Sequence, residues 1–285
     1  MSTVNVSNWN EFVTALTQAN SGDEINITND IDVQNYVQDF THSIHVADIT
    51  ELTINGNNYT IKNIANINFG SNDYHEIFLF TSNTTCHINN LNFSNVWLTS
   101  KSTCLFRTYN NTYEKIFVNN STINIKTKTQ IGFGGGLVFE NCMITFNQCT
   151  GLLGATQSSG ANPKFRYCWI RFNDWHEVPI GTDYPAFRNL NRCYLEGNLA
   201  FRDPTAVHKL FNCSSCCVNV SCLILGFDDV DTLIETSSDS LPNVINITKI
   251  PALATESSTT FNKLVSDEQM KNAEYLASIG FDIIP

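Results

Sequence analysis

The amino-acid sequence predicts an all-β fold built as a solenoid, in which short parallel strands stack into successive coils. Three observations predict it: low charge with abundant asparagine, helical patterns only near the two ends, and a loosely repeated strand pattern between them. Only 15% of the 285 residues are charged, whereas about a quarter is usual for soluble domains. Asparagine makes up about an eighth of the chain, and it favours turns over helices.

The first predicted element is a helix within an N-terminal capping segment, residues 1–24. Its apolar residues recur every three or four positions and share one helical face: Trp9, Phe12, Val13, Leu16 and Ala19. Ser7 is the expected N-cap, and Gly22 is the expected residue just after the helix. From Ile25 onward the apolar residues alternate with polar ones, as they do in a strand.

The second element is a solenoid over residues 25–230, because one strand pattern recurs along this part of the chain. The pattern starts with an apolar residue, continues with polar residues and a fourth position that is often cysteine, and ends in an apolar alternation. It recurs in six segments: 54–61, 88–95, 118–125, 139–146, 165–172 and 190–197. Their starts lie 34, 30, 21, 26 and 25 residues apart, which suits one repeat per coil.

The fourth position of this pattern predicts a column of cysteines inside the solenoid. The later segments place Cys142, Cys168 and Cys193 there, and Cys216 follows 23 residues after Cys193. Successive coils lie about 4.8 Å apart, so equivalent residues would stack as a ladder. A thiol is small enough for a tight inner corner. We therefore expect buried, reduced thiols at these positions; Cys213 and Cys216 lack the second cysteine pair that a zinc site needs.

The third element is a C-terminal extension, residues 231–285, with a capping or docking helix over residues 266–279. Ser266 and Gln269 have the spacing of a capping box at the start of this helix. Met270 and Leu276 lie on one helical face, and Gly280 is placed to end the helix. The helix would cover the last coil or dock on a neighbouring subunit.

These features resemble the right-handed parallel β-helix family, the pectin-lyase-like superfamily. The resemblance rests on the helix containing Trp9-Asn10-Glu11-Phe12, the turn from Ser21 to Thr28, and the alternating run from Ile49 to Ile61. It covers roughly residues 5–230 and implies a right-handed, single-stranded parallel β-helix whose first coil is capped by the helix. The superfamily includes lyases, hydrolases, adhesins and virus spikes, so the fold alone does not name a function.

The candidate ligand-binding residues lie in a polar and aromatic stretch from Arg171 to Arg188. As a loop, it would offer Trp175 and Tyr184 as platforms on which sugar rings stack. Asp174 and Glu177 could bond to sugar hydroxyls or act as acids, and His176 beside them is a further candidate for binding. The alternative is a loop whose rings pack on the solenoid or on a partner subunit. No catalytic residue is predicted, because no closely spaced carboxylate pair falls on adjacent predicted strands.

The sequence also predicts the absence of several partners. The chain has 16 basic and 27 acidic residues and a net charge of −11, which disfavours nucleic-acid binding. No segment reaches the roughly 18 apolar residues of a membrane-spanning helix, so we expect no membrane insertion. No cofactor and no metal ion are expected. No secretory signal is visible at the N-terminus, so we expect the protein to be assembled in the cytoplasm of the cell that makes it.

The C-terminal stretch SDEQMKNAEYLASIGFDIIP resembles a tag found in β-helical surface proteins and phage structural proteins of Gram-positive bacteria and their viruses. Together with the fold, this resemblance favours a structural or adhesive component of a phage virion: a head fibre, decoration protein or receptor-binding spike. It implies a homotrimer that contacts other virion proteins and displays a rigid surface to host glycans. The alternative is a polysaccharide lyase or glycosidase of the same superfamily; a bacterial surface adhesin would need an export signal.

Overall fold

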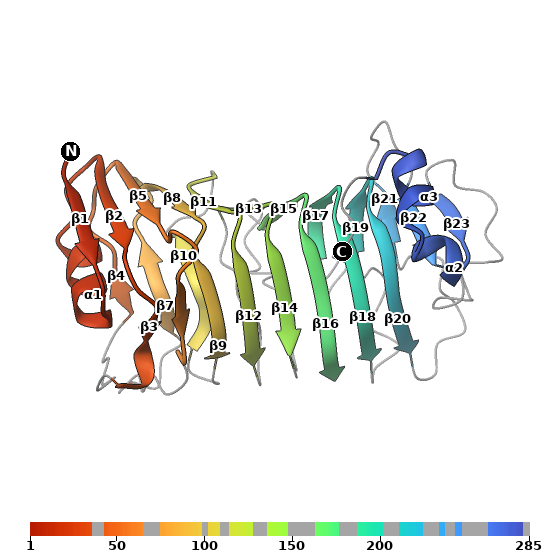
Figure 1. Cartoon of the computed structure of the whole chain (residues 1–285), viewed down its shortest axis with the longest axis horizontal. Coiled ribbons are helices and arrows are strands. Elements are labelled where there is room, and N and C mark those ends of the chain that lie inside the picture. Colours follow the sequence, from red (N-terminus) through yellow and green to blue (C-terminus); the bar gives the residue numbers. More distant parts are fainter. Residues whose placement is uncertain are drawn as a thin grey trace.

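The computed structural model describes residues 1–35, 43–64, 75–98, 102–108, 114–127, 136–147, 163–176, 187–201, 211–224, 234–236, 243–246 and 262–281. In these residues the chain folds as a parallel β-helix, an elongated solenoid with one helix at its N-terminal end and two short helices near the other end (Figure 1). Every described strand pairing is parallel. The predicted fold class is therefore confirmed.

Two long sheets and one short sheet form the walls. Sheet A contains, in spatial order, β1 (Thr3–Val6), β2 (Asp23–Ile27), β5 (Glu51–Asn55), β8 (Thr85–Asn89), β11 (Ile116–Asn119), β13 (Leu137–Glu140), β15 (Lys164–Arg166), β17 (Phe187–Asn191), β19 (Phe211–Ser214) and β21 (Ile234–Thr236). Sheet B contains β3 (Ile31–Asp32), β6 (Thr60–Lys62), β9 (Asn92–Leu98), β12 (Thr122–Thr127), β14 (Met143–Asn147), β16 (Trp169–His176), β18 (Tyr194–Phe201), β20 (Cys217–Ile224), β22 (Asn243–Asn246) and β23 (Asn262–Val265). The short sheet contains β4 (Ile44–His45), β7 (His75–Phe80) and β10 (Ser102–Thr108), and the helices are α1 (Trp9–Thr17), the 3-10 turn η1 (Val33–Asn35), α2 (Asp267–Met270) and α3 (Ala273–Ser278).

The solenoid extends beyond the predicted bounds of 25–230 at both ends. β1 precedes α1 and pairs with β2, so the segment 1–24 contains a strand as well as a helix. Its two apolar residues are too few to show a strand pattern in the sequence. At the other end, β22 and β23 continue sheet B past residue 230. The described strands within the predicted extension 231–285, up to Val265, therefore belong to the sheets of the solenoid.

α1 closes the N-terminal end of the core. Its N-cap is Asn8, one residue later than predicted, because the Asn8 side chain accepts the backbone N–H of Glu11. Gly22, with a φ of 82°, lies in the turn before β2 and not at the helix end, which is at Gln18. The helix buries three apolar residues against the coils: Trp9, Phe12 and Leu16.

Equivalent residues of successive coils stack in the core, as the repeated pattern predicts. One column of sheet B is at most 1% exposed throughout and runs through Ile61, Phe93, Ile123, Ile144, Ile170, Leu195, Val218 and Ile245. Aromatic rings stack in the same way, with Phe139 and Phe165 centroids 5.2 Å apart. Burial of each such side chain contributes about 2 kcal/mol, and close packing makes the rod rigid.

In six successive coils, from the one with β8 and β9 to the one with β19 and β20, a residue in the left-handed region turns the chain from sheet A into sheet B. The φ values are 50–53° at Asn90, Asn120, Asn141, Tyr167, Arg192 and Ser215. The backbone N–H of this residue donates to a carbonyl of the next coil, as from Asn141 to Arg166 at 3.1 Å. Asparagine adopts this conformation more readily than most residues, so the corner accounts for part of the asparagine excess.

The residue after this turn fills the inner corner, and it is the position of the predicted cysteine ladder. The side chains there are all buried: Leu91, Ser121, Cys142, Cys168, Cys193 and Cys216. The thiols of Cys142 and Cys168 donate to carbonyls of the preceding coil at 3.2 and 3.4 Å. The Cys216 sulfur also accepts the backbone N–H of Cys193 at 3.4 Å.

A serine hydroxyl makes similar hydrogen bonds at the equivalent corner of an earlier coil. Its Oγ, on Ser121, accepts the backbone N–H of Leu91 at 3.2 Å and donates to the carbonyl of Asn119 at 2.9 Å. The corner therefore favours a small side chain that both donates and accepts, which serine and cysteine provide. The seven cysteines whose side chains the structure describes, including all four of the ladder, are buried free thiols.

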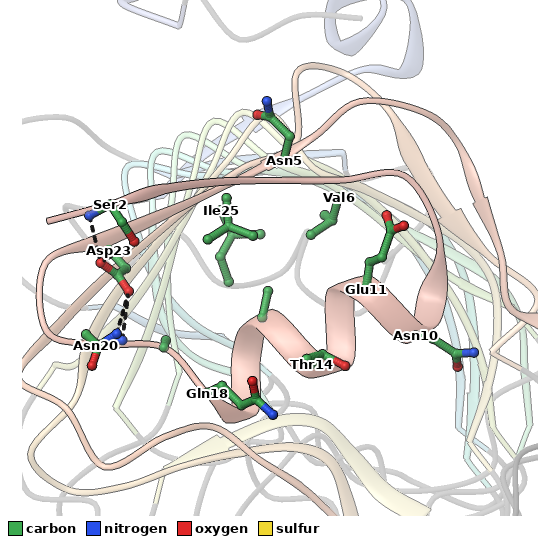
Figure 2. Close-up of a pocket in the computed structure, with 13 residues that line it drawn as sticks. Ser2, Asn5, Val6, Asn10, Glu11, Thr14, Gln18, Asn20, Asp23 and Ile25 are labelled. Atoms are coloured by element: carbon green, nitrogen blue, oxygen red, sulfur yellow. Dashed lines mark hydrogen bonds between the residues drawn. The ribbon is translucent and has the colours of Figure 1, made fainter.

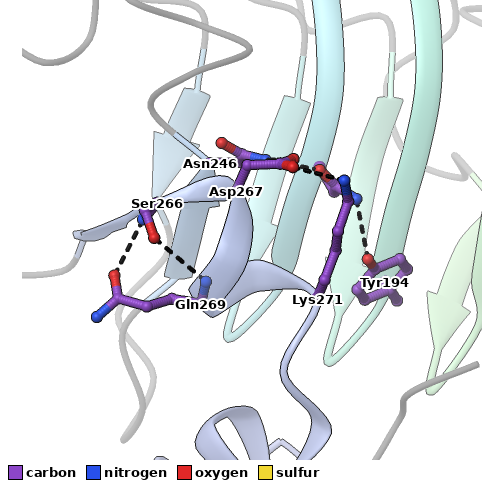
Figure 3. A network of polar contacts seen from close by, with 7 residues as sticks. Tyr194, Asn246, Ser266, Asp267, Gln269 and Lys271 are labelled. Carbon is purple, nitrogen blue, oxygen red and sulfur yellow. Dashed lines mark hydrogen bonds and ion pairs between the residues drawn. The ribbon is translucent and has the colours of Figure 1, made fainter.

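The predicted C-terminal helix over residues 266–279 is two short helices. They separate because the Asn272 side chain accepts the backbone N–H of Tyr275 and starts α3 as its N-cap. The capping box is confirmed: Ser266 Oγ accepts from the Gln269 N–H at 3.2 Å, and Gln269 Oε1 accepts from the Ser266 N–H at 3.0 Å (Figure 3). We call residues 266–281 the C-terminal clasp.

The C-terminal clasp folds back onto the outer face of sheet B. Its buried residues Met270, Leu276 and Phe281 form one apolar cluster with residues of the sheet: Tyr194, Cys217, Val244 and Val265. Polar contacts border this cluster, and Figure 3 shows Asp267 between Asn246 and Lys271. The clasp thus covers the side of its own solenoid.

Candidate ligand-binding groove

The structure describes only part of the polar and aromatic stretch from Arg171 to Arg188. The residues from Arg171 to His176 belong to β16 and are not a loop, because Trp175 pairs with Leu199 and His176 with Ala200 in β18. For three of the candidates, Asp174, Trp175 and His176, the backbone is described but the side chain is not. The other two, Glu177 and Tyr184, lie outside the described residues. The predicted sugar platform therefore stays a prediction.

A groove lies on the outer face of sheet A, across β13, β15, β17 and β19. It has a volume of about 570 Å³ and is lined by Glu140, Lys164, Arg166, Tyr167, Asn189, Leu190, Asn191 and Ser214. We call it the Tyr167 groove. None of its residues is among the candidates that the sequence predicts.

A β-bulge in β17 shapes the groove. The pairing of β17 with β19 shifts between Phe187 and Leu190, and Asn189 within this shift has a φ of 58°. On its other side, β17 pairs with β15 only at Leu190 and Asn191. Bulges bend a strand and re-aim its side chains, and they are common beside binding sites. Here Asn189 and Lys164, on the two strands that the irregularity separates, both line the groove.

Tyr167 and Arg192 occupy the left-handed corner position of two successive coils, at the edge of the groove. Their φ values are 52° and 50°. Tyr167 is 37% exposed, and the Arg192 guanidinium carbon lies 5.8 Å from the centroid of its ring. The backbone N–H of Tyr167 donates to the carbonyl of Asn191 at 3.0 Å, which fixes the corner. The rim of the groove is thus an exposed aromatic ring held on a rigid turn.

Ion pairs hold the polar side of the groove. Glu114, in the segment leading into β11, forms a close ion pair with Lys164 and lies 3.8 Å from Nη2 of Arg166. Glu140 is the neighbour of Arg166 across the β13–β15 pairing. The groove therefore combines cations, carboxylates, amides and one exposed ring, which are the groups that bond and stack with sugars.

A second hollow lies at the N-terminal end, between α1 and the first two strands (Figure 2). Its volume is about 460 Å³, and Val6 and Ile25 contribute apolar surface to it. Figure 2 shows Asp23 at its edge, bonded to Ser2 and Asn20. The backbone N–H groups of Ser2 and Asn20 each donate to the Asp23 carboxylate at 2.8 Å. This carboxylate ties the start of the chain to the turn before β2.

We expect acid to loosen this end of the solenoid. Hydrogen bonds from the backbone of Asn20 and Ser2 lower the pKa of Asp23 to about 2, from 3.8. Because the folded pKa is lowered, the ionised carboxylate stabilises the fold above about pH 4, and this contribution is lost as the pH falls towards 2. Amide hydrogen exchange, corrected for its intrinsic pH dependence, should show that β1 loses protection over this range. Asp23→Asn should lower protection of β1 at neutral pH and flatten the pH dependence; an equally steep profile in this variant would contradict the assignment.

Neither a metal centre nor a membrane-spanning helix is found in the part of the chain that the structure describes. Within those residues, no three or more His, Cys, Asp or Glu side chains are grouped so that they could hold a metal ion. The helices described there are too short and too polar to cross a membrane.

Residues 3–131 match a family model described as a "Putative pectate lyase-like adhesive domain". The match runs from β1 to just after β12, so the Tyr167 groove lies beyond it. No curated protein and no solved structure matched the chain. The family match and the all-parallel sheets agree on a pectate-lyase-like β-helix, and the description of the matched family names adhesion.

Proposed function

We propose that the chain is a structural and adhesive component of a bacteriophage virion, a rigid rod that presents a binding surface to the host. The observation that carries the adhesive role is the Tyr167 groove, an exposed aromatic and polar site on a stiff sheet. Adhesion needs a surface that keeps its shape when it is not bound, because less conformational entropy is then lost on binding. The family match supports this role through its description.

The proposal also places the chain on a virion. It draws support from the C-terminal clasp, whose sequence from Gln269 to Phe281 resembles a tag of β-helical surface proteins and phage structural proteins of Gram-positive bacteria and their viruses. The residues of this motif have defined places: Gln269 completes the capping box, and Met270, Leu276 and Phe281 are buried between the clasp and sheet B. A homotrimer, contacts with other virion proteins, and a role as head fibre, decoration protein or receptor-binding spike belong to this proposal.

We expect the chain to be found in purified particles of the virus that encodes it. Mass spectrometry of the particles should detect it, antibodies should label the particle surface, and sedimentation of the purified chain should give the mass of a trimer. Purified particles that lack the chain would remove the virion location, and a stable monomer would remove the trimer. Neither result would bear on the adhesive role, which is tested separately.

The adhesive role is tested against the alternative of a polysaccharide lyase or glycosidase. The purified chain is incubated with host cells and with host capsule or cell-wall glycan. Adhesion predicts saturable binding with the glycan left intact. New reducing ends without unsaturated ends would identify a glycosidase, and new unsaturated ends would identify a lyase. Absence of binding to both cells and glycans would refute adhesion.

A further inference from the structure

We infer that the Tyr167 groove is an oligosaccharide-binding site, in which one sugar ring stacks on Tyr167 and the hydroxyl groups of the chain bond to the polar residues of the groove. This inference rests on the proposed adhesive function and names the ligand class and the place of contact. It places the contact on sheet A, whereas the sequence points to a stretch that begins in β16 of sheet B.

The first argument is the backbone conformation of the corner. Asparagine fills this left-handed position at Asn90, Asn120 and Asn141, where it is well tolerated. Tyr167 and Arg192 then fill it in the next two coils, although the left-handed region costs such residues about 1 kcal/mol each. The fold alone would be served better by asparagine there. Tyr167 lines the groove and Arg192 lies beside it against the Tyr167 ring, so both side chains are placed to contact a ligand there.

The second argument is the direction in which the groove runs. Four polar residues form one outward-facing row across neighbouring strands: Glu140, Arg166, Asn191 and Ser214. Neighbouring strands lie about 4.8 Å apart, close to the length of one sugar unit in an extended polysaccharide. An oligosaccharide lying along the rod axis would thus meet one polar side chain per sugar unit. The ring of Tyr167 stands at the edge of this row.

The third argument is the charge of the groove. Three cations lie in or beside it, Lys164, Arg166 and Arg192, but Glu114 pairs with the first two and Glu140 adds a second carboxylate. The charges nearly balance, and carboxylates exposed in the groove would repel a polyanion. Paired charges and amides suit the donor and acceptor character of hydroxyl groups. We therefore assign a neutral oligosaccharide as the ligand.

The test uses a substitution that the corner accepts. Tyr167→Asn and Arg192→Asn place the preferred residue at each left-handed position, so both variants should melt at or above the temperature of the unchanged protein. Host glycan is partially hydrolysed, separated into neutral and acidic oligosaccharide pools, and immobilised for binding measurements. The unchanged chain should bind the neutral pool, and Tyr167→Asn should weaken this binding about tenfold, the loss expected for one stacked ring. Tyr59→Asn is the matched control, because Tyr59 is equally exposed, at 36%, but lies in an early coil.

Each outcome decides between the inference and the function on which it rests. If the unchanged chain binds and Tyr167→Asn binds equally well, the groove assignment is wrong while adhesion stands. If Tyr59→Asn loses as much affinity as Tyr167→Asn, the effect is not local to the groove and the inference fails. Binding to the acidic pool alone would overturn the charge argument. Binding to neither pool would refute glycan adhesion itself.

Discussion

Replacing Gly197 with alanine should destabilise the solenoid by about 3–5 kcal/mol, the sum of a backbone clash and a forced φ angle. Gly197 lies in β18 opposite Phe172 of β16, with a φ of 115°. A Cβ atom there would lie 2.0 Å from the carbonyl oxygen of Phe172 and 2.8 Å from its carbonyl carbon. Both are backbone atoms in a packed sheet, so they cannot turn aside as a flexible side chain could. One of the two strands must shift, and the side chains that this strand buries in the core must shift with it.

Gly22→Ala separates the clash from the conformational cost. Gly22 also has a positive φ, 82°, but no atom lies within 4 Å of the Cβ that alanine would add. This variant should lose only about 1 kcal/mol. Thermal and denaturant unfolding of the two variants gives the comparison. Equal losses would mean that the β16–β18 approach is not a close contact in the folded protein.

The columns of the solenoid could be predicted from the sequence, because a parallel β-helix repeats its chemistry once per coil. The spacing of Cys142, Cys168, Cys193 and Cys216 placed one residue per coil at the same corner, and the structure puts all four side chains in the buried interior. The capping box at Ser266 was visible for a similar reason, since it depends on two residues three positions apart. A short spacing or a regular repeat can be recognised directly in the sequence, so features that depend on one can be predicted.

The ends of the elements could not be predicted with the same certainty. β1 contributes only Val4 and Val6 to an alternating pattern, so its membership of sheet A depends on pairing with β2 across the whole of α1. Asn272 occupies a position compatible with a continuous helix, yet its side chain bonds to the Tyr275 N–H and begins a new helix. In both cases alternative groups compete for the same backbone hydrogen bond, and the sequence pattern does not show which of them forms it.

The groove was missed because each strand contributes only one to three of its residues. Glu140, Arg166 and Asn191 are about 25 residues apart in sequence and become neighbours only through the strand register. The stretch from Arg171 to Arg188 is conspicuous in the sequence because its polar and aromatic residues are contiguous. One signal for the groove was present: the position before the ladder cysteine changes from Asn141 to Tyr167. A bulky residue at a repeated turn marks a departure from what the fold alone requires.

The C-terminal clasp should detach when Leu276 is changed to serine. Leu276 and Met270 are fully buried, and their cluster rests on Tyr194, Cys217 and Val244 of sheet B. Truncating a buried leucine costs about 2–5 kcal/mol, and burying a serine hydroxyl without a partner adds to this. α2 has four residues and α3 has six. An isolated helix needs about 12 residues to be stable in water. The helices therefore depend on docking, and loss of the apolar contact should unfold the whole clasp.

Ala277→Ser is the matched control, because it places the same side chain one position further along α3, where the residue is exposed. Leu276→Ser should make the clasp sensitive to limited proteolysis and should increase binding of a hydrophobic dye to the uncovered face of sheet B, while Ala277→Ser should do neither. The core columns should keep their hydrogen-exchange protection in both variants, because the clasp packs on the outer face of the sheet and not in the interior. If Leu276→Ser instead lowered protection along the columns, the clasp would be holding the last coils together, and its role would be to cap the solenoid as well as to cover its side. A clasp that stayed resistant to protease in Leu276→Ser would show that the hydrogen bond from Asn246 of sheet B to Asp267 helps to hold it without the apolar contact.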